Sequence, residues 1–198
     1  MDDLTSAVTT SAGEGISSNS LATLNALSCD VFGDPVSGVC EKPKVLFYDV
    51  YVTPEIVQSF NNGSFSDVEV IFGNVNVDEH YYLTDLSFLR NVKMIGGYLY
   101  IRENNALTSL SGLDSVTIIG THVSIIYNGA LTSLNGLGSL TAIGGYVNIY
   151  GNSVLTSLNG LDSVTTIGGY VNIYSNSGAG NTAPSNIRDA TQECRLGC

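Results

Sequence analysis

The densest group of residues that could do chemistry is Asp78, Glu79, His80 and Asp85. Carboxylates this close together could supply calcium ligands or form an acid/base pair. No adjacent acidic loop completes the about six to eight oxygen ligands that calcium prefers, and His122, the other histidine, lies far along the chain. No motif places a nucleophile or a carboxylate to act with either histidine. We therefore expect no catalytic residue, no metal and no cofactor, and we interpret the cluster as a polar edge of a larger structure.

Four cysteines form two close pairs near the ends of the chain, Cys29 with Cys40 and Cys194 with Cys198. This placement favours two local disulfides, because the ends of an elongated molecule lie too far apart to be bridged. Four reduced thiols are the alternative, and the wide spacings disfavour zinc. Asn62 begins the sequon Asn62-Gly63-Ser64, an acceptor for N-glycosylation in a secreted protein.

Tyrosine and asparagine recur at fixed spacing in the second half of the chain, where only Asp162 is charged between residues 119 and 178. Each tyrosine offers an apolar ring and a hydroxyl, so an exposed array could stack on sugars or pack against a protein. Stabilisation of neighbouring strands is the alternative role. The candidate binding residues, here called the Tyr/Asn face, are Tyr98, Tyr100, Tyr146, Asn148, Tyr150, Tyr170, Asn172 and Tyr174.

A repeat of 24 residues positions these side chains. It is defined by the isoleucines at 71, 95, 119, 143 and 167 and by parallel columns of leucine. After each isoleucine, apolar and polar residues alternate, as in residues 146–150, which predicts a strand. Leucine at every third position in the rest of the repeat is too tightly spaced for a long amphipathic helix. The pattern predicts a mainly β protein, a single right-handed β-solenoid of about five coils that bury their apolar sides by stacking.

A threonine column also follows the period, at residues 84, 108, 132 and 156. It is similar to the hydroxyl arrays of ice-binding solenoids. Turn formation is the simpler role for a threonine in the Leu-Thr-Ser-Leu segments.

Residues 145–161, Gly-Tyr-Val-Asn-Ile-Tyr-Gly-Asn-Ser-Val-Leu-Thr-Ser-Leu-Asn-Gly-Leu, resemble the repeat of receptor L domains and their leucine-rich β-solenoid relatives. The resemblance extends over residues 71–176. It implies an extracellular domain that binds ligands or builds the cell surface. It also implies an asparagine ladder that bonds the backbone of successive turns, formed here by Asn104, Asn128, Asn152 and Asn176, with His80 at the corresponding place of the first coil.

Charge and hydropathy exclude several partners. The 198 residues carry 18 acidic and 7 basic side chains, and the formal net charge of -11 disfavours nucleic acid and anionic membrane surfaces. No segment approaches the about 18 apolar residues of a membrane span, so we expect no direct membrane insertion.

The expected organisation has four parts: a flexible Ser/Thr/Ala-rich tail (1–28), an N-terminal cap with a short helix that begins near Thr53 and Pro54 (29–70), the solenoid (71–176) and a C-terminal cap (177–198). We expect an extracellular or cell-surface protein without enzymatic activity. Its expected function is recognition or adhesion, with the Tyr/Asn face binding a protein or a glycan. The alternative is a structural subunit that associates with copies of itself into a surface coat or fibre.

Overall fold

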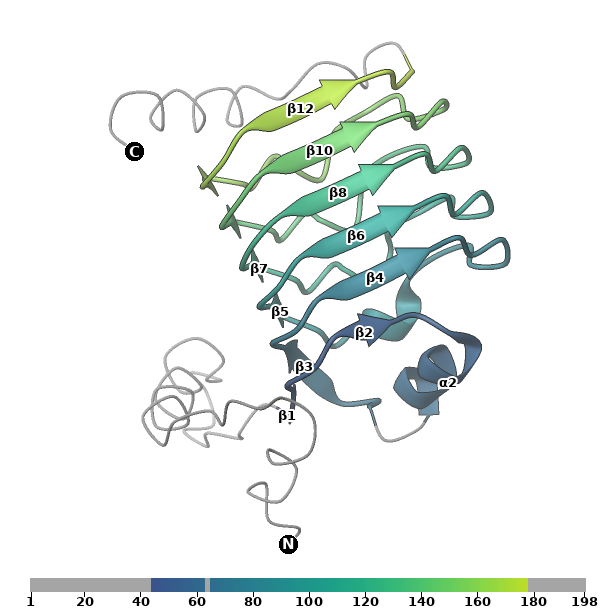
Figure 1. Ribbon diagram of the computed structural model, residues 1–198, viewed down its shortest axis with the longest axis vertical. Helices are drawn as coiled ribbons and strands as arrows, with labels where there is room; N and C mark the ends of the chain where they lie inside the picture. The colour runs from purple at the N-terminus through teal and green to yellow at the C-terminus, as the bar shows by residue number, and fades with distance from the viewer. Residues whose placement is uncertain (1–43, 63–64, 178–198) are drawn as a thin grey trace, which may run out of the picture.

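The computed structural model describes residues 44–62 and 65–177 (Figure 1). The cysteine pairs, the tail, most of the expected C-terminal cap and residues 63 and 64 of the sequon lie outside the described residues. The disulfides and the glycosylation of Asn62 therefore stay predictions.

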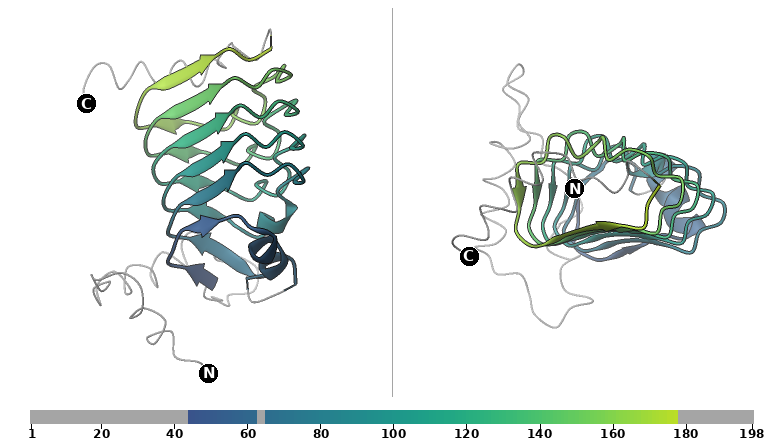
Figure 2. Two further views of the ribbon diagram at one scale, coloured as in Figure 1. Left: turned by 45° about the vertical axis from the view of Figure 1, so that its right-hand side comes forward. Right: turned by 90° about the horizontal axis from the view of Figure 1, so that it is seen from above.

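Within the described residues, two six-stranded parallel sheets make up the solenoid. The first sheet consists of short strands: β1 (Lys44–Leu46), β3 (Val68–Ile71), β5 (Met94–Ile95), β7 (Ile118–Ile119), β9 (Ala142–Ile143) and β11 (Thr166–Ile167). The second sheet consists of β2 (Val50–Tyr51), β4 (Val75–Asp78), β6 (Leu99–Arg102), β8 (Val123–Ile126), β10 (Val147–Tyr150) and β12 (Val171–Tyr174). Each coil passes from a short strand through a glycine-containing corner into a long strand, and returns along a leucine-rich segment (Figure 2).

The predicted fold class is confirmed: the protein is a mainly β solenoid of about five turns. From β4 onward, strand partners in the second sheet are residues 24 positions apart, as in the pairing of Val147 with Val123 and Val171. The sequence period is therefore also the hydrogen-bonding register of the sheets. Every position of a coil lies beside the same position of the next coil.

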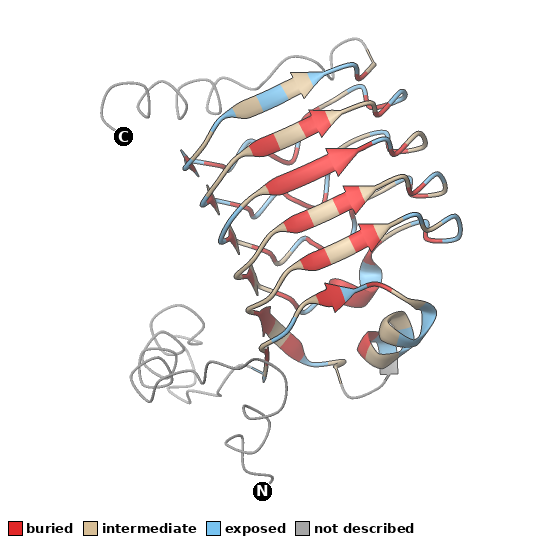
Figure 3. Ribbon diagram, viewed as in Figure 1, coloured by how far each residue is buried: buried red, intermediate tan, exposed pale blue. Residues whose placement is uncertain are grey.

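The core runs as continuous columns along the solenoid axis. Side chains of one strand alternate between its two sides, so the first and third residues of each long strand point inward. Leu99 and Ile101 in β6, like Val147 and Ile149 in β10, are fully buried (Figure 3). At β12, the last described strand, the corresponding Val171 and Ile173 are only partly buried.

The N-terminal end contains the predicted short helix, α2 (Pro54–Asn62). The Thr53 hydroxyl accepts a hydrogen bond from the backbone N–H of Ile56 at 3.3 Å, and proline suits the first helical position because it needs no donor there. Phe60 from this helix packs edge-on against Phe88 of the 3₁₀ helix η2 (Ser87–Leu89), with ring centroids 5.9 Å apart. Strands β1 and β2 precede α2 and already pair with β3 and β4, so both sheets extend into the segment expected to form the cap. The division of the chain at residues 28, 70 and 176 stays a prediction.

Candidate functional site

The outer side of the second sheet carries the Tyr/Asn face. Tyr100, Asn148 and Asn172 are the second residues of their strands, and Tyr150 and Tyr174 are the fourth, so all five point away from the core. Tyr98, Tyr146 and Tyr170 immediately precede the strands and also point outward. The strands thus bring together all eight predicted residues on one surface.

The first outward column is a continuous aromatic stack. The ring centroids are 4.8 Å apart for Tyr98 and His122, 4.2 Å for His122 and Tyr146, and 5.0 Å for Tyr146 and Tyr170, with interplanar angles of 18°, 14° and 2°. Each ring covers a face of its neighbour, so the stack presents ring edges and polar atoms outward. Partial burial between the tyrosines lowers the pKa of His122 below its ordinary value.

A second stack stands at the other edge of the face. Tyr150 and Tyr174 lie parallel, with centroids 4.7 Å apart and an interplanar angle of 6°. Burial, followed by the proximity of Tyr174, raises the pKa of the Tyr150 phenol. Tyr127 packs edge-on against Tyr150 at 5.3 Å and an angle of 88°, and half of its surface is exposed.

Tyr127 is a further tyrosine of this surface that the alternating strand pattern does not predict. It is the turn residue before Asn128, outside the alternating strand pattern, and its φ of 58° lies in the left-handed region. The same column contains Glu79, Glu103 and Ser175, also with positive φ, and aligning these turn positions would have drawn attention to the single tyrosine among them.

The middle of the face is less open than its edges. Ser124 has only 4% of its surface exposed and Ile126 only 7%, although both point outward, so neighbouring side chains cover them. Asn148 is half-buried, and its Oδ1 atom has no hydrogen-bond partner among the described residues. Asn172, at the C-terminal end of this column, is exposed.

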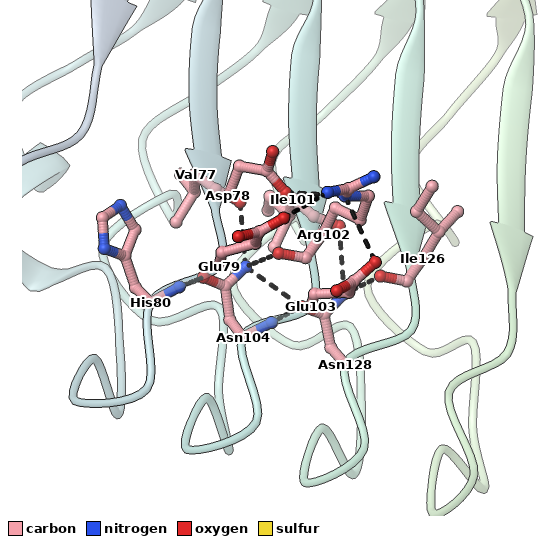
Figure 4. A network of polar contacts seen from close by, with 10 residues as sticks. All are labelled: Val77, Asp78, Glu79, His80, Ile101, Arg102, Glu103, Asn104, Ile126 and Asn128. Carbon is pink, nitrogen blue, oxygen red and sulfur yellow. Dashed lines mark hydrogen bonds and ion pairs between the residues drawn. The ribbon is translucent and has the colours of Figure 1, made fainter.

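The acidic cluster at Asp78 forms an ion-pair network with the adjacent coil (Figure 4). Arg102 donates from Nε to Asp78 at 2.7 Å and from its terminal nitrogen to Glu79 at 2.6 Å, and Glu103 lies 3.5 Å from Nε. The hydrogen bond to Asp78 raises the pKa of the Arg102 guanidinium. These carboxylates therefore serve to join two coils.

The rest of that cluster also has structural partners. Asp85 accepts a hydrogen bond from the backbone N–H of Ser87 at 2.9 Å, and hydrogen bonds from Ser87 lower the pKa of this carboxyl. The His80 ring contacts Tyr82 edge-on at 5.4 Å. Across residues 44–62 and 65–177, no three or more His, Cys, Asp or Glu side chains are grouped so that they could hold a metal ion.

The asparagine ladder runs along one edge of the second sheet (Figure 4). The backbone N–H of Asn104 donates to Oδ1 of Asn128 at 3.1 Å, and the same bond links Asn128 to Asn152 at 2.9 Å and Asn152 to Asn176 at 3.1 Å. Each Nδ2 donates to a backbone carbonyl of the preceding coil, such as Val77 for Asn104 at 2.9 Å. The first coil lacks the asparagine, but the backbone N–H of His80 donates to Oδ1 of Asn104 at 3.0 Å. The ladder is thus continued to that coil by a main-chain donor.

The threonine column joins coils in a similar way. The hydroxyl of Thr108 donates to the carbonyl of Thr84 at 3.2 Å, and Thr132 donates to Thr108 at 3.4 Å. Since these hydroxyls bond along the solenoid axis, their regular spacing follows from coil stacking. An ice-binding role is not needed to explain it.

The fold and this surface together define a leucine-rich β-solenoid whose outward strand residues form a stacked aromatic face. Residues 49–135 match the sequence model of the Receptor L domain family, so the predicted resemblance is confirmed and the solenoid is receptor L-domain-like. Receptor L domains are ligand-binding modules without enzymatic activity, typically in the extracellular part of receptors. The chain matches no curated protein. The matched range includes Tyr98, Tyr100, Asn104 and Asn128, and the later tyrosines occupy equivalent positions in the following coils.

In the part of the chain that the structure describes, no helix has the length and apolar character needed to span a bilayer.

Proposed function

We propose that this protein is an extracellular, non-catalytic recognition or adhesion module that binds a partner protein at the cell surface through its Tyr/Asn face. The observation that carries the proposal is the pair of aromatic stacks that flank the second sheet. Side chains held by stacking lose little conformational entropy on binding, and rigid tyrosines are frequent energetic centres of protein interfaces.

The stacking geometry favours a protein over a glycan as the partner. Sugars bind aromatic residues through open ring faces, whereas Tyr146 has a stacked neighbour on both sides, at 4.2 Å and 5.0 Å. Ring edges and hydroxyls remain available, and they suit a flat protein surface that supplies hydrogen-bond partners.

The distribution of charge also favours the Tyr/Asn face as the binding site. Between residues 119 and 178 only Asp162 is charged, and it lies in the leucine-rich segment rather than on the second sheet. A partner that docks on the C-terminal half of the face would therefore bury few charges, which avoids their desolvation penalty.

A double substitution, Tyr146→Ser with Tyr170→Ser, tests the proposal. We expect it to abolish binding of the labelled protein to cells of its source organism. Folding should remain nearly intact because neither side chain fills the core, although loss of the two stacked contacts of Tyr146 lowers stability by about 0.2–1 kcal/mol each. Tyr81→Ser with Tyr82→Ser is the matched control: these tyrosines are 67% and 53% exposed and lie off the face, so binding should persist.

Two further measurements separate the alternatives. Light scattering over a range of concentrations detects self-association, and its loss in the double variant would favour a structural subunit of a coat or fibre. A glycan array on which the parent binds and the double variant does not would favour a sugar ligand. If the double variant binds cells with parental affinity, the Tyr/Asn face is not the site. Residues 1–70, which hold ten of the 18 acidic side chains, then become the next candidate.

A further inference from the structure

Two pairs of tyrosines at the C-terminal end of the second sheet lie ring on ring. Tyr146 and Tyr170 are nearly parallel, at an angle of 2° and a centroid distance of 5.0 Å, and Tyr150 and Tyr174 are at 6° and 4.7 Å. Tyr150 and Tyr174 are direct partners in the parallel register of β10 and β12. Each of these tyrosines therefore has the ring of a second tyrosine stacked on its own.

This arrangement suits the coupling of two phenols. One-electron oxidation of a tyrosine removes an electron and the hydroxyl proton, and the resulting phenoxyl radical has unpaired spin on the ring carbons ortho to the oxygen. Two such radicals form a carbon–carbon bond between ortho carbons, and each ring then moves its ortho hydrogen to its oxygen and becomes a phenol again. The overall reaction consumes one hydrogen peroxide for two tyrosines and yields one dityrosine and two waters.

We propose that Tyr146–Tyr170 and Tyr150–Tyr174 are sites of oxidative cross-linking, where a dityrosine bond joins the last two described coils. The oxidant is hydrogen peroxide activated by a haem peroxidase. Holding the two reacting rings together replaces a bimolecular encounter with an intramolecular step, which raises the effective concentration of one radical near the other. Tyr170 and Tyr174 are 56% and 50% exposed, and Tyr146 and Tyr150 are partly exposed, so both members of each pair can be oxidised.

Two conditions favour the reaction: a second tyrosine stacked on the first, and access of the oxidant. The following tyrosines do not have a second tyrosine stacked on them. Tyr127 meets Tyr150 at 88°, so the two rings are perpendicular and not stacked. Tyr98 is separated from Tyr146 by the intervening ring of His122. Tyr81, at 67%, is more exposed than any tyrosine of the face, and Tyr82, at 53%, is about as exposed as Tyr170 and Tyr174. The only ring contact among the described residues for this pair is nevertheless that of Tyr82 with His80. Geometry, and not exposure, therefore selects the reactive pairs.

A cross-link here would strengthen the last described coil. Val171 and Ile173 of β12 are only partly buried, whereas their equivalents in β10 are fully buried. A covalent bond between residues 24 positions apart reduces the freedom of the unfolded chain, as a disulfide of the same loop length does. The expected effect is a higher unfolding temperature of the solenoid.

The full-length protein, treated with horseradish peroxidase and hydrogen peroxide at high dilution, tests the proposal. The monomer is isolated by size exclusion, digested and analysed by mass spectrometry and by the blue fluorescence of dityrosine. We expect cross-linked peptides that contain Tyr150 with Tyr174 and Tyr146 with Tyr170, each lighter by two hydrogen atoms than the sum of its parts. The yield per molecule should not depend on protein concentration, and the cross-linked monomer should melt at a higher temperature than the untreated protein.

Matched variants decide whether the stacks direct the reaction. Tyr174→Phe keeps the ring and hence the packing, but it should abolish the Tyr150–Tyr174 product and leave the Tyr146–Tyr170 product. Tyr81→Phe should change neither product. Tyrosine consumption without dityrosine in the monomer, or cross-links at Tyr81 and Tyr82 in yields equal to those of the stacked pairs, would overturn the proposal. An unchanged melting temperature of the cross-linked monomer would overturn its stabilising role. The cell-binding assay uses untreated protein, so the two proposals fail independently.

Discussion

At the scale of single residues, polar side chains at the edges of the second sheet provide specific bonds between coils. Asn104 combines four such bonds: its side chain donates to the Val77 carbonyl and to Oδ1 of Asn128 and accepts from the N–H of His80, and its own N–H donates to the same Oδ1. Because this residue is fully buried, water cannot replace these partners. Removal of the amide therefore leaves buried groups unpaired, which costs more than the bonds themselves contribute.

Asn104→Ala should lower the free energy of unfolding by about 3 kcal/mol, since each buried group left unpaired costs roughly 1–3 kcal/mol. The adjacent Asn105 is exposed and provides the control: Asn105→Ala should change stability by less than about 0.5 kcal/mol. Urea denaturation followed by circular dichroism measures both. Equal stability of the two variants would show that the ladder contributes little.

His122 should make stability depend on pH. Burial between Tyr98 and Tyr146 lowers the pKa of His122 in the folded protein, so the unfolded chain binds the proton more tightly. This contribution to the free energy of unfolding is present above the unfolded pKa of about 6.5 and is lost as the pH falls below it. His122→Phe retains an aromatic ring in the stack and should flatten the pH dependence between about pH 7.5 and 5.5.

Denaturant titrations of parent and variant at both pH values provide the measurement. The lowered pKa values of Glu55, Asp67 and Asp85 produce a separate loss of stability at lower pH, below about 4.5, where these carboxyls become protonated. Identical pH profiles of parent and variant over the higher range would contradict the assignment to His122.

At the scale of the structural elements, the position of a residue within the coil decides whether its side chain enters the core. Leu131, in the turn segment that follows β8, is fully buried, whereas its neighbour Thr132 is exposed. The corners impose a second condition, which concerns the size of the side chain. The leucine-rich segments of adjacent coils approach each other so closely there that some positions have no room for a Cβ atom. At Gly136, φ is 114°, and an added Cβ would collide with the carbonyl oxygen of Leu110 in the preceding coil.

Leu131→Asp should unfold the solenoid, since an unpaired buried charge costs several kcal/mol against a total stability of about 5–15 kcal/mol. Thr132→Asp introduces the same charge at an exposed position and should be mild. Thermal melts followed by circular dichroism compare the two variants. Similar melting temperatures would mean that the inward and outward positions are assigned incorrectly.

Gly136→Ala should lower the free energy of unfolding by at least about 1–3 kcal/mol, the usual cost of an unfavourable backbone conformation. Gly138→Ala is the matched control two residues away, because no atom lies within 4 Å of a Cβ added there. Its stability should stay within about 0.5 kcal/mol of the parent. Chemical denaturation of both variants tests this, and a tolerated Gly136→Ala would show that the corner can relax.

At the scale of the whole molecule, the solenoid is a chain of contacts between neighbouring coils. No coil buries its apolar side alone, so stability depends on stacking and on what covers the ends. At the N-terminal end α2 packs on the 3₁₀ helix through Phe60 and Phe88. Restraints near either end would limit fraying of the terminal coils.

Disulfides are the expected restraints, and we predict that Cys29 is bonded to Cys40 and Cys194 to Cys198. Each pair is close in sequence and adjoins one end of the repeats. Peptide mapping of a non-reduced digest should recover only local pairs. A peptide that joins Cys29 or Cys40 to either C-terminal cysteine would rule out separate restraints at the two ends.

The sequence by itself determined the solenoid, its register and the outward position of the tyrosines. In a stack of coils of constant length, residues 24 positions apart become spatial neighbours. A column such as Ile95, Ile119 and Ile143 therefore directly predicts which residues are in contact. Alternation within each strand then assigns every residue to the core or to the surface.

Only the tertiary structure decided how the outward side chains interact. Periodicity places Tyr150 beside Tyr174, but the parallel stacking of their rings and the perpendicular packing of Tyr127 depend on side-chain torsions and on a left-handed turn residue. The period also does not reveal that Arg102 of the next coil forms ion pairs with both Asp78 and Glu79. In the sequence these two residues are an isolated acidic pair. The N-terminal strands β1 and β2 lie where the repeat pattern is absent, because α2 there replaces the leucine-rich segment that makes a coil recognisable. A repeat reveals which backbone positions are neighbours, whereas the chemistry of a surface depends on side-chain directions that the period does not specify.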